Sequence, residues 1–159
     1  MRAFICAALA AVTFADKSNF PHDSHMHAGC HVSAQFNDYT YEQLYAILDT
    51  EIRSWDSDST SPSGGVYSLK EEGSNDYIWS TRLTLNKKYT DDQLFEFNTS
   101  GSGCMIGGKS RSQSVSYLDN DVNFCNLWNV YNGVGAEFTY STGKCSGSPN
   151  DPATTCARY

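Results

Sequence analysis

The chain has 159 residues, of which 18% are charged and 13% aromatic, and its net charge is −7. Lys and Arg are scattered rather than clustered, which excludes nucleic acid as an expected partner, because binding to phosphates draws on grouped cations. The length is typical of one domain with one core. The low charge and the many aromatic, Gly, Ser, Thr and Asn residues favour an extracellular, strand-rich protein.

Residues 1–15 carry the pattern of a secretory signal peptide. Arg2 precedes a 12-residue apolar run, and small residues follow at a plausible cleavage point after Ala15. A helix that spans a membrane needs about 20 apolar residues, so no membrane span is expected here or later in the chain. Cleavage would leave a mature chain that begins at Asp16 and is secreted into an extracellular, disulfide-permitting compartment.

Residues 16–38 show no hydrophobic periodicity and are mostly polar, which predicts a flexible arm ahead of a single domain at 39–159. The arm holds every histidine of the chain. Four imidazoles and one thiol fall within ten residues, and such groups are the usual ligands of Cu and Zn. The predicted metal ligands are His22, His25, His27, Cys30 and His31. The alternative is a solvated polar arm without metal.

The domain is predicted to open with an amphipathic helix. Thr40 is followed three residues later by Gln43, which is the spacing of a capping box. Apolar residues then recur at steps of three and four. They are Tyr41, Leu44, Tyr45, Leu48, Ile52 and Trp55. A loop rich in Asp, Ser, Thr, Pro and Gly follows at 56–65.

Beyond this loop the pattern favours strands, because apolar and polar residues alternate with a period of two. Strands are expected around 66–72, 77–85, 94–97, 104–106, 113–118, 122–131 and 136–141. The predicted fold class is α+β, with one helix packed on a curved, roll-like antiparallel sheet of about five to seven strands. Cystatin-like and NTF2-like rolls have a similar order of elements, but this resemblance is architectural and implies no function.

Five cysteines follow the predicted signal peptide. Cys104, Cys125, Cys145 and Cys156 are expected to form two disulfides, whose connectivity the sequence leaves open. Cys30 is then the odd thiol, available to a metal or to a second copy of the chain in a disulfide-linked homodimer.

Two short motifs complete the analysis. Asn98 begins the only N-glycosylation sequon and is predicted to carry a glycan in a eukaryotic host. Asp119, Asp121 and Asn123 resemble the opening of a calcium loop, but Phe124 stands where that loop requires Gly. A tight turn between two strands is the preferred interpretation.

No catalytic residue is predicted, because all histidines lie on the expected arm, where no preorganised triad can form. The predicted function is a secreted, non-enzymatic binding or surface-interaction domain with a Cu or Zn site on its arm. Its expected partner is an extracellular protein, a glycan or a small apolar ligand. The first alternative is a carrier that holds a small apolar ligand inside a roll lined by aromatic residues, with the candidates Tyr67, Tyr77, Trp79, Phe97, Trp128 and Phe138. Behind it stands a small hydrolase or isomerase that uses a bound metal or carboxylates, with the candidates Asp49, Glu51, Glu71, Glu72, Glu96 and Glu137.

Overall fold

A computed structural model describes residues 17–73, 75–100 and 103–159. The predicted signal peptide at 1–15 lies outside these residues. The elements, in chain order, are η1 (Lys17–Asn19), β1 (Gly29–Phe36), α1 (Tyr41–Ser54), β2 (Val66–Gly73), β3 (Tyr77–Leu83), β4 (Thr90–Ser100), β5 (Gly103–Ser112), α2 (Val122–Gly133), β6 (Thr139–Thr142) and α3 (Pro152–Cys156). No helix in these ranges is long and apolar enough to cross a membrane.

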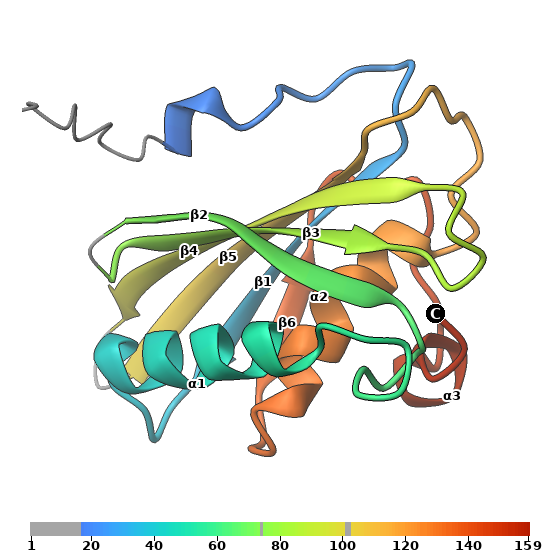
Figure 1. The fold of residues 1–159 in the computed structure, drawn as a ribbon. Coiled ribbons are helices and arrows are strands. Elements are labelled where there is room, and N and C mark those ends of the chain that lie inside the picture. Colours follow the sequence, from blue (N-terminus) through green and yellow to red (C-terminus); the bar gives the residue numbers. More distant parts are fainter. Residues whose placement is uncertain (1–16, 74, 101–102) are drawn as a thin grey trace, which may run out of the picture.

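The fold is α+β, with a six-stranded antiparallel sheet in the order β2-β3-β4-β5-β1-β6. Figure 1 shows α1 and α2 on one side of this sheet, while the segment that follows η1 runs over the other side. The main core lies between the sheet and the two long helices. It includes Val32, Phe36, Leu48, Phe95, Ile106 and Leu127, all with no exposed surface.

Helix α1 begins at a capping box in which Thr40 and Gln43 exchange hydrogen bonds between side chain and backbone. These two bonds satisfy donors that the first turn of a helix leaves without partners. Leu44, Leu48 and Ile52 recur at a spacing of four and are fully buried. One face of α1 therefore packs on the sheet, and the opposite face is polar.

The prediction of a flexible arm at 16–38 is wrong for its second half, because Gly29–Phe36 forms strand β1 between β5 and β6. Its buried and partly exposed residues alternate strictly, so Cys30, Val32, Ala34 and Phe36 face the core. The first half is also packed. Phe20 makes an edge-to-face contact with Trp79 at 5.3 Å on the outer face of the sheet. The packed domain thus begins before residue 39.

The strand expected at 122–131 is a helix, α2 (Val122–Gly133). A continuous apolar run does not distinguish a buried strand from a buried helix by its periodicity. Asn123, Asn126 and Asn129 recur every three residues and are buried along α2. The turn before it also differs from expectation, since it leads into a helix rather than between two strands. Asp119 accepts hydrogen bonds there from the backbone and side chain of Asn123.

The structure contains two disulfides, but their members differ from those predicted. Cys30 pairs with Cys145, and Cys125 pairs with Cys156. Cys104 is a free, buried cysteine on β5. Because Cys30 is bonded within the chain, it offers no thiol for a homodimer and no thiolate for a metal. Both disulfides fasten the C-terminal tail to the domain.

Candidate binding site

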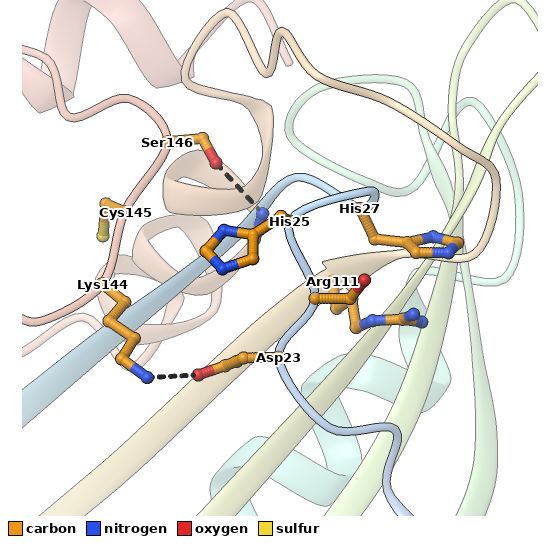
Figure 2. Close-up of a pocket in the computed structure, with 9 residues that line it drawn as sticks. Asp23, His25, His27, Arg111, Lys144, Cys145 and Ser146 are labelled. Atoms are coloured by element: carbon orange, nitrogen blue, oxygen red, sulfur yellow. Dashed lines mark hydrogen bonds and ion pairs between the residues drawn. The ribbon is translucent and has the colours of Figure 1, made fainter.

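A surface cleft of about 330 Å³ lies where three distant parts of the chain meet. They are the segment that leads into β1, the end of β5 and the C-terminal tail, as Figure 2 shows. The residues that line the cleft are Asp23, Ser24, His25, His27, Gly29, Arg111, Lys144, Cys145 and Ser146. Two of the predicted metal-binding histidines are among them.

The wall formed by the tail is held to β1 by covalent and hydrogen bonds. Cys145 is bonded to Cys30, on the neighbouring strand. The amide of Ser146 donates to the carbonyl of Gly29 at 3.0 Å, and the amide of Gly29 donates to the Ser146 hydroxyl at 3.3 Å (Figure 2). The tail is therefore fixed in register with β1 over the whole cleft, although 115 residues separate the two cysteines.

The opposite wall is fixed by the loop after β5. The amide of Ala28 donates to the carbonyl of Ser116 at 2.8 Å, and the amide of Ser116 donates to the carbonyl of Met26 at 3.0 Å. His27 also donates from Nδ1 to the carbonyl of Ser112 at 3.0 Å, because a carbonyl oxygen only accepts. The cleft is thus preformed, with both walls tied to the sheet.

Asp23 neutralises one of the two permanent cations in the cleft. Its carboxylate lies 3.2 Å from the Lys144 ammonium and 2.9 Å from Nε2 of His31. Partial burial opposes the ionisation of Asp23, but the hydrogen bonds from His31 and Lys144 outweigh it and hold the pKa of Asp23 below its ordinary value. Asp23 is therefore ionised at neutral pH and already paired.

Arg111 is the other permanent cation of the cleft, and within the described chain it has no ion pair. Its Nε atom is buried without a hydrogen-bond partner. His25 also lines the cleft, is exposed, and makes no hydrogen bond with another described residue. Arg111 thus brings to the cleft a guanidinium without an internal ion pair, and such a group binds anions through charge-assisted hydrogen bonds.

The structure separates the five predicted metal ligands. His25 and His27 line the cleft, whereas His31 is bonded to Asp23 and Cys30 is bonded to Cys145. His22 is exposed and does not line the cleft. Within the described ranges, no three His, Cys, Asp or Glu side chains are grouped so that they could hold a metal ion. Binding of Cu or Zn by these histidines stays a prediction from the sequence.

Sequence reasoning missed the charged residues that shape the cleft, above all Arg111 and Lys144. Lys109 and Arg111 alternate on one strand, but only the fold shows that Lys109 pairs with Glu96 while Arg111 remains unpaired. Lys144 adjoins Cys145, and the unexpected pairing of that cysteine brings both residues to β1. No local pattern contains this information.

None of the carboxylates considered for catalysis lines the cleft. Asp49 and Glu72 both bind Arg53, and Glu96 binds Lys109. Three other carboxylates are buried, but hydrogen bonds inside the domain satisfy them. Asp92 accepts from the Trp79 indole and from Lys70 at 2.9 and 3.1 Å. Asp91 accepts from Ser112 and Asn126 at 2.8 and 2.9 Å. Asp119, whose pKa burial raises to about 6, accepts from Asn123. Neither Asp91 nor Asp119 lines the cleft.

Asn98, in the predicted glycosylation sequon, is exposed near the end of β4. An exposed side chain is what a glycosyltransferase requires, so glycosylation at Asn98 stays a prediction.

No protein-family model matches this chain, and no curated protein is significantly similar to it in sequence.

Proposed function

We propose that the protein is a secreted, non-enzymatic binding domain whose cleft receives an anionic group, such as a sulfate or a carboxylate, of an extracellular ligand. The observation that carries this proposal is Arg111, which lines a preformed cleft with no internal ion pair and with a buried, unpartnered Nε atom. Lys144 and two histidines lie around the same cavity, and only Asp23 opposes them in charge.

The packing of the domain interior favours ligand binding at the surface and disfavours a carrier with an internal cavity. Of the aromatic residues expected to line a roll, Tyr67 and Phe97 are part of the main core. Tyr77 and Trp79 are covered by Phe20 on the outer face. These four side chains fill space, whereas the other two candidates, Trp128 and Phe138, line a hollow at the surface. Ligands are therefore expected at surface hollows.

The proposal is tested by calorimetric titration with sucrose octasulfate as an anionic probe and sucrose as its neutral counterpart. The secreted protein with intact disulfides should bind the sulfated probe more tightly than sucrose, because the cleft contains a cation without an internal ion pair. Arg111→Gln should weaken binding by about tenfold or more, the scale of one lost charge-assisted contact. Arg158→Gln, a change at an exposed arginine outside the cleft, is the matched control. Equal affinity of wild type and Arg111→Gln would overturn the proposal.

A further inference from the structure

A second hollow, of about 620 Å³, lies between the end of α2 and the start of β6. Three aromatic side chains line it, namely Trp128, Phe138 and Tyr140. Its polar lining includes Asn37, Asn132 and Glu137. The volume is in the range of sites that bind small ligands, about 300–1,000 Å³. None of these residues lines the cleft around Arg111.

Two of these aromatic rings, Phe138 and Tyr140, pack against aromatic residues of the core. Phe138 stacks on Phe36, with ring centroids 5.3 Å apart, and also meets the edge of Tyr131 at 6.0 Å. Tyr140 contacts Phe124 edge to face at 5.9 Å, yet 43% of its surface is exposed. Phe36, Phe124 and Tyr131 belong to the core, so a ligand meets rings that need little further ordering.

The polar side chains of this hollow have no hydrogen-bond or ion-pair partner among the described residues. Within the described residues, the side chains of Asn37, Asn132 and Glu137 form no hydrogen bond and no ion pair, and neither do the Trp128 indole and the Tyr140 hydroxyl. The cleft of Figure 2 differs, because its Asp23, Lys144 and Ser146 already have partners. The second hollow thus combines flat apolar rings with free donors and acceptors.

This combination selects the chemistry of the ligand. A purely apolar ligand would bury the two amides and the carboxylate without partners, which costs free energy. An anionic ligand would meet Glu137, the only charged group in the lining, and be repelled. A sugar ring presents polarised C–H groups to the negative face of an aromatic ring and hydroxyl groups around its rim. We propose that this hollow is a binding site for a neutral carbohydrate, with Trp128 and Tyr140 as its aromatic surfaces and Asn132 and Glu137 as its hydrogen-bonding groups.

This site is independent of the anion cleft, and the two proposals can fail separately. The test is nuclear magnetic resonance titration of the disulfide-bonded protein with cellotriose, chitotriose and mannotriose, each to about 10 mM, the weak end of specific binding. At least one trisaccharide should shift the signals of Trp128 and of residues 135–140. The residues of the anion cleft should not respond, and Arg111→Gln should leave this binding unchanged.

Variants then assign the contacts. Asn132→Ala and Glu137→Gln change exposed side chains, so the fold should persist, and each should weaken the affinity for the bound trisaccharide about fivefold or more. Asn150→Ala, at an exposed asparagine in the C-terminal tail, should leave the affinity within about twofold. The proposal is overturned if no trisaccharide binds to wild type, if the shifts map elsewhere, or if both variants at the site bind like the control.

Discussion

The carboxyl group of Glu51 on α1 lies directly against Gly133, the last residue of α2. A Cβ atom added to Gly133 would overlap this carboxyl group, so the contact depends on glycine at that position. One oxygen of Glu51 is buried without a hydrogen-bond partner in the described chain. Desolvation by burial raises the pKa of Glu51 to about 8, because no cation compensates for the lost hydration of its charged form.

Glu51 therefore makes stability depend on pH in a defined direction. A carboxyl group with a raised pKa stabilises the fold fully below its ordinary pKa of 4.5, and this contribution is lost as the pH rises to about 8. Between pH 5 and pH 9, wild type should lose on the order of 3 kcal/mol of unfolding free energy relative to Glu51→Gln. Urea denaturation at both pH values measures this difference.

Glu42→Gln serves as the control for this experiment, since Glu42 lies on the same helix but is exposed and its pKa is lowered. Its stability should follow that of wild type from pH 5 to pH 9. Parallel curves for wild type and Glu51→Gln over the same interval would show that the Glu51 carboxyl is not held protonated.

The disulfide pairing predicts a specific pattern of thiol reactivity. Native protein should not react with a thiol reagent, because Cys104 is the free cysteine of the described chain and has no exposed surface. After denaturation without reductant, one thiol of the described residues should react, and peptide mapping should place it at Cys104. Labelling of Cys30 or Cys145 under these conditions would contradict the pairing that forms the cleft.

Loss of the Cys125–Cys156 disulfide should lower stability without removing the cleft. The double variant Cys125→Ala and Cys156→Ala releases the tail beyond α2, and a loop of 31 residues corresponds to about 3–4 kcal/mol of unfolding free energy. Because the tail at Cys145 stays bonded to β1, binding of sucrose octasulfate should persist at temperatures where this variant is folded. Melting curves and calorimetry test the two halves of this prediction.

The role of β1 distinguishes the observed fold from a domain with a free arm. Deletion of residues 16–31 removes the first three residues of β1 and the disulfide at Cys30, so this variant should fail to fold or should melt far below wild type. Phe20→Ala removes one side chain from the small cluster on the outer face of the sheet, so it should cost about 1.5–3 kcal/mol and leave a folded domain. Circular dichroism melting separates the two cases. A deletion variant that melts like wild type would support the flexible arm predicted from the sequence and contradict the packed β1.

Local patterns in the sequence predicted the class of fold but not all of its parts. Thr40 and Gln43 are three residues apart, and this capping-box spacing predicts the start of α1. The alternation of apolar and polar residues from Tyr77 predicts β3. Both signals are local in the sequence. Strand β1 escaped prediction because its outward positions, such as His31 and Gln35, are polar, and its inward positions include Cys30 and Ala34 rather than large apolar residues. The identity of α2 depends on burial, since its apolar run is compatible with either state.

The candidate sites were harder to predict because they depend on long-range contacts. Two residues of the histidine cluster, His25 and His27, line the cleft. The unpaired state of Arg111 was not visible in the sequence, because it follows from strand register and from the pairing of Lys109 with Glu96 instead. The pairing of Cys30 with Cys145 likewise depends on tertiary contacts rather than spacing.

The most direct test of the account is to locate a bound anion at atomic resolution. Isotope-labelled protein, with its disulfides intact, would be titrated with sucrose octasulfate at pH 5.5, and the amide and arginine side-chain signals would be followed. The account predicts that the largest shifts fall on residues 24–29 and 144–146 and on the guanidinium signals of Arg111. Saturating shifts that leave Arg111 and these two segments unchanged would contradict it.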